Sequence, residues 1–206
     1  MARALAGSLG VLGVIVEVSL KVLPRPATET TLRFEMDEIA ALAQLSAMGG
    51  RPLPVSASAW CAGMLALRLS GAPDAITDAR RRLGGEEIDG SSFWTGIREQ
   101  QHPFFTGEAP LWRLSLPSTA APIGLGETQL IEWGGALRWL RSPRAAAEIR
   151  TRVQQLGGHA TLFRGGDRSQ GVFTPLAPAL AAIQRRLKAE FDPAGIFNAG
   201  RMYPEF

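Results

Sequence analysis

The sequence predicts an α+β fold of antiparallel sheets with helices on one face, and three observations lead to this prediction. Short segments rich in branched and aromatic residues alternate with helical patterns along the chain. A weak internal repeat matches Ala-Leu-Arg at residues 66–68 to the same letters at residues 136–138, and Pro73 to Pro143 at the same offset. Helical patterns end at Gly-Gly pairs, at residues 49–50, 84–85 and 157–158. Together these features predict two ferredoxin-like βαββαβ units.

The composition is that of an ordinary soluble globular protein, with 206 residues, of which 46% are hydrophobic and 20% charged. The formal net charge is +3, and 22 basic residues are scattered among 19 acidic ones. A nucleic-acid binder concentrates its basic residues on one element, so a basic ferredoxin-like binder of RNA is the least favoured class. Cys61 is the single cysteine, which excludes an internal disulfide and indicates a reducing compartment. Its apolar surroundings favour a core position over a nucleophile.

The stretch GSLGVLGVIVEV at residues 7–18 is the most distinctive part of the sequence. Its apolar run resembles the centre of a signal peptide but stops at Glu17. Over residues 14–23 apolar and mixed positions alternate, until Pro24 and Pro26 follow, which predicts a strand with one apolar face. The glycines precede this strand and are spaced G-x-x-G-x-x-G, which disfavours a Rossmann nucleotide site. They serve either a tight turn or a close approach of the backbone to a ligand.

The first predicted unit has clear start and stop signals. Asp37 is an N-cap before a helix whose Ile39, Leu42 and Leu45 face inward. Pro73 begins a second helix, which runs to residue 83. Strands are predicted for the chain as a whole over residues 28–34, 53–60, 64–70, 86–89, 111–116, 128–133 and 159–164.

The second predicted unit lacks a clear first helix, which is degraded around residues 120–126, and its second helix begins at Pro143. Between the units, residues 91–105 are predicted to be helical before His102 and carry several aromatic side chains, which either pack against another layer or form a surface for a partner. The last helix is predicted to begin at Thr174-Pro175 and to end at Asp192-Pro193. Its apolar face comprises Leu176, Leu180, Ile183, Leu187 and Phe191.

Catalytic patterns are few in this sequence. His102 and His159 are the only histidines, and neither has a Cys, His or carboxylate at metal-ligand spacing, so no metal site is predicted. There is no G-x-S-x-G nucleophile elbow and no phosphate-binding P-loop. The residues alone therefore predict a globular α+β protein without a self-contained active site.

Both ends of the chain resemble one known family. The stretch GSLGVLGVIVEVSLKVLPRP resembles the last strand of the FAD-binding domain in the FAD-linked oxidases, the group of vanillyl-alcohol oxidase and D-lactate dehydrogenases. FDPAGIFNAGRMY, residues 191–203, resembles the closing motif of the same family. Val-Ile-Val-Glu-Val and Arg-Met-Tyr are similar to the FAD-binding subunits of bacterial glycolate oxidases. The resemblance implies that this chain corresponds to the C-terminal part of such a subunit.

The resemblance also implies a domain organisation and a set of cofactor contacts. Residues 1–26 would be the end of the FAD-binding domain, residues 27–172 a duplicated substrate or cap domain, and residues 173–206 a helix and tail that return to the FAD. Ala199 stands where the family has proline, which loosens the turn before Arg201. The residues implied to lie along the FAD are Gly10, Val11, Gly13, Val14, Val16, Asn198 and Arg201.

The implied reaction is oxidation of a 2-hydroxy acid, glycolate to glyoxylate, with the flavin as acceptor. An arginine would bind the substrate carboxylate, but the sequence does not indicate which one. The implied partners are other glycolate oxidase subunits, one flavin-containing and one iron–sulfur, and the small acid itself, with no nucleic acid and no transmembrane segment. The implied location is the cytoplasm or the inner-membrane surface, through partner subunits. The isolated chain is expected to bind FAD weakly or not at all and to be inactive, and a non-catalytic assembly subunit stays open as an alternative.

Overall fold

The computed structural model describes residues 2–205. These residues divide into two compact units. One unit is continuous and comprises residues 24–167. The other joins the two ends of the chain, residues 2–23 and 168–205.

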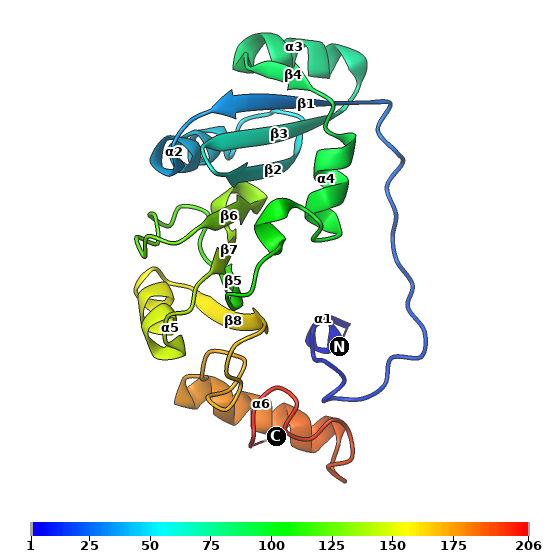
Figure 1. The fold of residues 1–206 in the computed structure, drawn as a ribbon. Helices are drawn as coiled ribbons and strands as arrows, with labels where there is room; N and C mark the ends of the chain where they lie inside the picture. Colours follow the sequence, from blue (N-terminus) through cyan, green and yellow to red (C-terminus); the bar gives the residue numbers. More distant parts are fainter. Residues whose placement is uncertain (1, 206) are drawn as a thin grey trace. The chain divides into compact units, whose positions relative to one another are not determined.

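The continuous unit contains an open antiparallel sheet of eight strands in the order β4-β1-β3-β2-β6-β7-β5-β8, drawn in Figure 1. All seven strand pairings are antiparallel. The strands are β1 Thr28–Glu35, β2 Val55–Cys61, β3 Met64–Gly71, β4 Glu86–Ile88, β5 Leu111–Ser115, β6 Gln129–Glu132, β7 Leu137–Arg141 and β8 His159–Arg164. The predicted α+β class is therefore confirmed.

The two halves of the sheet repeat one topology. The first half has the order β4-β1-β3-β2 and the second, read from its outer edge, the order β8-β5-β7-β6. The halves meet where β2 pairs with β6. The predicted degraded helix of the second half is an irregular segment at residues 116–128, from which Leu116 and Ile123 fill the core.

The short sequence repeat does not mark equivalent positions in these halves. Leu67 of β3 lies opposite Leu32 of β1, in the layer packed against helices. In the second half Arg138, not Leu137, takes this face of the sheet, opposite Leu114 of β5. Because side chains alternate across a strand, the two Ala-Leu-Arg triplets direct matching residues to opposite faces. The topology supports duplication, whereas this triplet match does not.

Three helices cover one face of the sheet. They are α2 Glu38–Met48, α3 Pro73–Leu83 and α5 Ala146–Gln155. Helix α4 Ser91–Arg98 and the short 3₁₀ helix η1 Pro103–Phe105 lie on the opposite face, as Figure 1 shows for α4 against α2 and α5. The helices of the two repeated units therefore share one face, and the segment predicted to lie between the units packs on the other.

The predicted helix starts are confirmed for α2 and α3, whereas the start predicted for α5 is wrong. Asp37 accepts a hydrogen bond from the Ala40 amide at 2.8 Å, as an N-cap does. Leu42 and Leu45 are buried as predicted, but Ile39 is 69% exposed. Pro73 begins α3, whereas α5 begins at residue 146, three residues after the proline predicted to open it.

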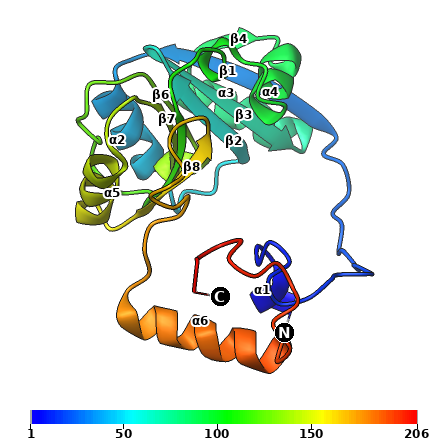
Figure 2. The ribbon, with the colours of Figure 1, turned by 60° about the horizontal axis from the view of Figure 1, so that its bottom comes forward.

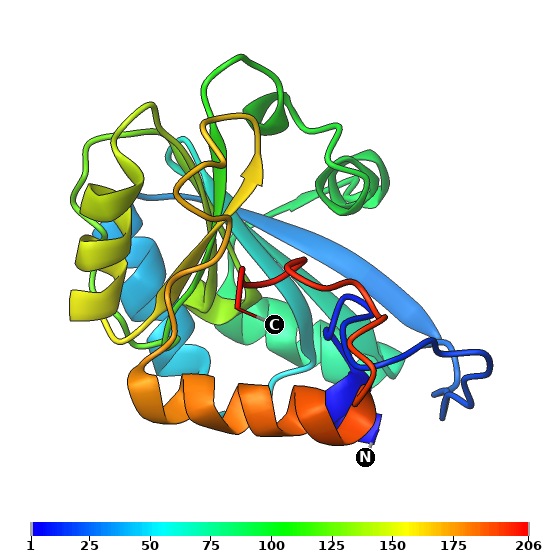
Figure 3. The ribbon, with the colours of Figure 1, turned by 90° about the horizontal axis from the view of Figure 1, so that it is seen from below.

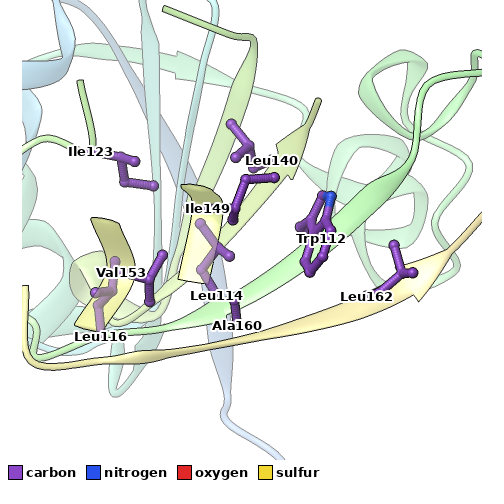
Figure 4. Close-up of a cluster of buried hydrophobic side chains, with 9 residues drawn as sticks. All are labelled: Trp112, Leu114, Leu116, Ile123, Leu140, Ile149, Val153, Ala160 and Leu162. Atoms are coloured by element: carbon purple, nitrogen blue, oxygen red, sulfur yellow. The ribbon is translucent and has the colours of Figure 1, made fainter. Parts of the chain in front are cut away.

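Aliphatic and aromatic side chains form a close-packed core beneath α5, shown in Figure 4. The cluster comprises Trp112, Leu114, Leu116, Ile123, Leu140, Ile149, Val153, Ala160 and Leu162. A second cluster lies beneath α4 and η1 on the other face and includes Cys61. The core position predicted for Cys61 is confirmed, and desolvation raises the pKa of its thiol.

Two arginines hold irregular segments in this unit. Arg138 is fully buried and donates to the carbonyl oxygens of Gly135, Ala120 and Ala121. Arg141 donates to four carbonyl oxygens in residues 104–109. Part of the high arginine content is therefore structural, because each guanidinium satisfies several backbone acceptors at once.

The unit formed by the chain ends contains two helices, α1 Ala2–Leu5 and α6 Pro178–Phe191. Helix α6 begins at a proline three residues later than predicted, after the N-cap Ala177. Leu180 and Ile183, predicted to face inward, are exposed. The buried positions of α6 are Ala181 and Lys188.

The strand predicted over residues 14–23 does not form. These residues have no regular secondary structure and pair with none of the eight described strands. Their large apolar side chains are between 53% and 92% exposed. An alternating pattern encodes a strand only where a neighbouring strand accepts its backbone hydrogen bonds, and the described residues supply no such neighbour.

Substitution Ile149→Ala is expected to destabilise the continuous unit by about 2–5 kcal/mol, because it leaves a cavity in a close-packed core. All five tryptophans lie in this unit, so urea unfolding followed by tryptophan fluorescence measures its stability. Ile39→Ala on the exposed side of α2 is the control, with an expected change below about 0.5 kcal/mol. Equal effects of the two substitutions would contradict the assigned core.

Candidate functional site

The two chain ends meet at the glycine-rich turn. The Asn198 side-chain amide donates to the Leu9 carbonyl oxygen at 2.8 Å. A Cβ atom on Gly10 would lie 2.8 Å from the Asn198 Nδ2 atom, and the φ of Gly10 is +75°. Figures 2 and 3 show the N-terminal segment beside the C-terminal tail in this unit. Gly10 is therefore required for the close approach of the tail.

Lys188 is the buried centre of this contact. From α6 its ammonium group donates to the Val11 carbonyl at 2.8 Å and to the Phe197 carbonyl at 2.6 Å. Its third partner is the Asp192 carboxylate, one helical turn later, at 2.5 Å. An ammonium group has three donors, and here each one has a partner: one on the glycine turn, one on the tail and one on its own helix.

Asp192 completes the arrangement from the end of α6. Its carboxylate accepts hydrogen bonds from the backbone amides of Ile196 at 3.0 Å and Phe197 at 2.9 Å, besides Lys188. Burial opposes ionisation of this carboxyl group, but the hydrogen bonds from Lys188, Phe197 and Ile196 outweigh it and lower its pKa to about 2. We call Lys188 and Asp192 the clasp.

A further contact anchors the tail. The Tyr203 hydroxyl lies 3.2 Å from the Thr174 carbonyl oxygen, and the ring of Tyr203 packs near that of Phe173. Asn198 has a φ of +40°, a conformation that asparagine tolerates better than most side chains do. The closing motif is therefore held at both its beginning and its end.

The residues implied to bind FAD fall into two groups in this structure. Val11 is buried, its amide donates to the Ser8 carbonyl and its own carbonyl accepts from Lys188. Gly13 has open space where a Cβ would be, and Val14 and Val16 are exposed. The first group, which includes Gly10 and Asn198, builds the turn; the second is free to face a ligand. Arg201 is exposed at the end of the tail turn.

The continuous unit has a site of its own, a broad cavity of about 1360 Å³ on the sheet face that carries α4. We call it the open-face cavity. It is lined by residues of β1, β2, β3, β5, β6, β7 and β8, by residues of α2 and α4, and by Trp133. Its polar lining includes Arg68, Arg113 and Glu132.

Arginine–tryptophan pairs occur at both ends of this cavity. The Arg113 guanidinium carbon lies 5.7 Å from the centre of the Trp133 ring, and that of Arg68 lies 5.6 Å from the Trp94 ring. Trp133, in the 3₁₀ helix η2 Trp133–Gly135, is 66% exposed. Such stacking orients a planar guanidinium and leaves its edge available.

Glu132 lies beside Arg113 and Trp139. Its carboxylate accepts a hydrogen bond from the Trp139 indole at 2.7 Å. Desolvation raises the pKa of Glu132, and the Trp139 hydrogen bond and the Arg113 charge oppose that rise. No local sequence pattern indicates this group, because Arg113, Glu132 and Trp139 come from three strands and Trp133 from η2.

The aromatic segment at residues 91–105 packs against the sheet. Trp94 donates to the Thr31 hydroxyl at 2.9 Å, and Phe104 is buried in the cluster beneath η1. An exposed patch of Phe93, Trp94 and Phe104, the expected sign of an assembly surface, is therefore not present. Of the two interpretations of this segment, the packing one is correct.

The histidines have structural settings. His102 caps η1 by accepting a hydrogen bond from the Phe104 amide at 3.2 Å, and desolvation lowers its pKa. His159 begins β8 and is exposed. Among residues 2–205 no three His, Cys, Asp or Glu side chains are grouped so that they could hold a metal ion. No helix in the same range is both long enough and apolar enough to cross a membrane.

A search of curated proteins decides the relationship of the chain. It matches the glycolate oxidase subunit GlcE of Escherichia coli with 44% identity over 205 residues. The chain is similar to this subunit over its whole length. The resemblance drawn from the two terminal motifs is therefore confirmed. No protein-family model matches the chain.

The match covers 100% of this chain and 57% of GlcE, so the chain spans little more than half of its relative. The match over 205 residues includes the glycine turn, the tail and the clasp that joins them. The similarity to GlcE also extends over the whole unit that contains the open-face cavity.

Replacing Lys188 by Met is expected to release the glycine turn from the tail in this GlcE-like chain. Two carbonyl oxygens and one buried carboxylate lose their donor, so amide exchange at residues 196–198 accelerates on the order of tenfold or more. Hydrogen exchange with mass spectrometry measures this effect. Arg186→Met, which removes an exposed cation of the same helix, is the control; unchanged exchange in Lys188→Met would refute the role of the clasp.

Acid is expected to open the clasp in a defined range. The pKa of Asp192 falls from an ordinary 3.8 to about 2 in the folded chain, so its stabilising effect is complete above about pH 4 and is lost as the pH falls through 2. Pepsin cleavage of the tail measures this opening, because the enzyme works across that range. In Asp192→Asn the tail is expected to be cleaved at every pH from 4 to 2, and identical pH profiles for the two proteins would contradict the assignment.

Proposed function

We propose that this chain forms part of a flavoprotein subunit of a complex that oxidises glycolate to glyoxylate. The observation that carries the proposal is the 44% identity to glycolate oxidase subunit GlcE over the whole chain. The contact between the chain ends supports it, since both terminal motifs belong to one unit. The activity of the whole protein is part of this proposal, because the chain spans 57% of its relative.

FAD is the cofactor of the proposed function, and residues of the glycine turn and tail would contact it. When bound, the flavin accepts the hydride equivalent from the 2-hydroxy acid. The residues that fit such contacts are Gly13, Val14 and Val16, whose surroundings are open, together with Arg201 at the exposed end of the tail turn. We propose that backbone groups of residues 13–16 bind along the cofactor, since glycine permits close approach.

The other predicted contacts would act indirectly. Val11 uses both of its backbone groups within the unit, and Gly10 and Asn198 contact each other. In the proposed function these three residues hold the turn in shape so that Gly13 and the following residues are presented to FAD. The clasp fixes the same geometry from α6.

Partners follow from the same relationship. We propose other subunits of a glycolate oxidase complex as partners, one flavin-containing and one carrying iron–sulfur clusters, and a small 2-hydroxy acid as substrate. The exposed apolar side chains of residues 14–23 support a role for that segment in pairing with a further strand of the assembled protein. We place the complex in the cytoplasm, with peripheral attachment to the inner membrane through partner subunits.

A non-catalytic assembly subunit that no longer binds FAD is the second candidate function. The exposure of Leu180 and Ile183 on α6 and of the apolar side chains in residues 14–23 favours it, because such surfaces are typical of contacts between chains. The two candidates differ in whether residues 13–16 contact FAD.

Titration of FAD with the purified chain, followed by quenching of flavin fluorescence, distinguishes these functions. Weak binding is expected, because the chain corresponds to only part of a flavoprotein subunit, and Gly13→Val is expected to abolish it, since Gly13 has a φ of +149°. Gly195→Val, at another positive-φ glycine with open space in the same unit, is the control. Tight stoichiometric binding would contradict the expected weak affinity, and equal binding by wild type and Gly13→Val would refute the proposed contact.

A further inference from the structure

One arginine of the open-face cavity has no protein partner for its guanidinium edge. Arg113 projects from β5 and lies opposite Trp139 of β7 and Thr161 of β8. Within residues 2–205 it forms neither a hydrogen bond nor an ion pair through its side chain, and its stacking contact with Trp133 is on the ring face. A half-buried guanidinium in this state has donors ready for an incoming acceptor.

The other arginines that the strands carry on this side of the sheet are occupied, whereas Arg51 of the cavity lining is an exposed loop residue. Arg33 pairs with Glu86 at 2.5 Å. Arg68 donates to the Ser56 hydroxyl at 2.9 Å and lies near Glu29. Arg141 is used by four backbone carbonyl groups. Among the strand arginines on this side of the sheet, Arg113 is thus the one whose guanidinium has no hydrogen-bond or ion-pair partner within residues 2–205.

Arg33 occupies the position in the first half of the sheet that Arg113 occupies in the second. In the first half Phe34 lies opposite Leu65, the second residue of β3, and in the second half Leu114 lies opposite Arg138, the second residue of β7. Arg33 and Arg113 each precede these residues and therefore occupy equivalent positions in the repeated topology. At this position Arg33 forms an ion pair with Glu86, whereas the guanidinium of Arg113 has no ion-pair partner within residues 2–205.

We propose that Arg113, held against the face of Trp133, binds the carboxylate of a small 2-hydroxy or 2-oxo acid in the open-face cavity. The substrate class rests on the proposed function, whereas the choice of residue rests on geometry. A planar guanidinium binds a carboxylate through two parallel N–H···O bonds. The cavity, at about 1360 Å³, is larger than such an acid requires, so the ligand occupies the Arg113 end only.

Glu132 sets the strength and specificity of this site. It is a carboxylate of the cavity lining whose charge interacts with that of Arg113, and it repels a second carboxylate. Its hydrogen bond from Trp139 fixes its orientation, and its remaining acceptor capacity suits a hydroxyl donor such as the 2-hydroxyl group. The site therefore combines one cation for the carboxylate with one acceptor for the neighbouring hydroxyl.

The test is an NMR titration of the full chain with glycolate, glyoxylate and the uncharged isostere glycolamide, without FAD. Glycolate and glyoxylate are expected to bind and glycolamide to bind on the order of tenfold more weakly. Arg113→Lys keeps the charge but loses the planar fork, so affinity for glycolate is expected to fall about tenfold or more. Glu132→Gln keeps an acceptor for Trp139 and removes the repulsion, so affinity is expected to rise about threefold.

Arg33→Lys at the equivalent position of the first half is the matched control and is expected to leave binding unchanged. The proposal is overturned if glycolate does not bind at tens of millimolar (~50 mM), if Arg113→Lys binds as wild type does, or if sulfate displaces glycolate at equal concentration. Tryptophan fluorescence unfolding of each variant verifies that the sheet is intact.

The carboxylate site and the proposed function can be refuted independently of each other. Carboxylate binding is measured on the continuous unit without flavin, whereas FAD binding is measured at Gly13 in the other unit. Loss of FAD binding with retained glycolate binding refutes only the flavoprotein assignment. Retained FAD binding with no effect of Arg113→Lys refutes only the carboxylate site.

Discussion

A single buried ammonium group organises the unit that contains both chain ends. Lys188 donates to the glycine turn, to the tail and to Asp192, and these partners come from three separate segments of the chain. Without this cation, two carbonyl oxygens and one carboxylate would be left in a poorly solvated place, which is costly. The positions of Gly10 and Asn198, and of every proposed cofactor contact, follow from that constraint.

The continuous unit obeys a different constraint, the parity of its strands. Alternation directs aliphatic side chains of β3 toward the helices and Arg68 toward the open face. In the second half the same rule buries Arg138 and exposes the edge of Arg113. Arg138 and Arg113 lie on neighbouring strands but have different roles. Arg138 binds the carbonyl oxygens of an irregular segment, and Arg113 faces the cavity. The two halves share one strand order, and they differ at single positions such as these.

Local signals made most of the fold predictable. Caps, prolines, Gly-Gly pairs and alternating strand patterns are encoded within a few residues, and they predicted α2, α3 and seven of the eight strands; β7 was not predicted. The Asp37 cap and the core position of Cys61 are examples. The strand at residues 14–23 could not be judged from its own pattern, because pairing depends on a neighbour elsewhere. The triplet repeat misled for a similar reason, since a sequence match does not fix which face a residue takes.

The candidate sites were only partly accessible to sequence reasoning. The terminal motifs brought Gly10 and Asn198 together correctly, but Lys188 was missed. Its signals were its rarity, as one of two lysines in an arginine-rich chain, and its spacing of four residues from Asp192. Arg113, Glu132 and Trp133 had no local signal, because the open-face cavity depends on strand order.

The exposed segment at residues 14–23 has a consequence for handling the chain in solution. It joins high β-propensity, strong apolar character and an unpaired backbone, the combination that favours intermolecular β-aggregation. Glu17 and Lys21 are its only charged side chains, and both prolines come after it. These two residues therefore act as gatekeepers, and the colloidal behaviour of the chain depends on them more than on the stability of either folded unit.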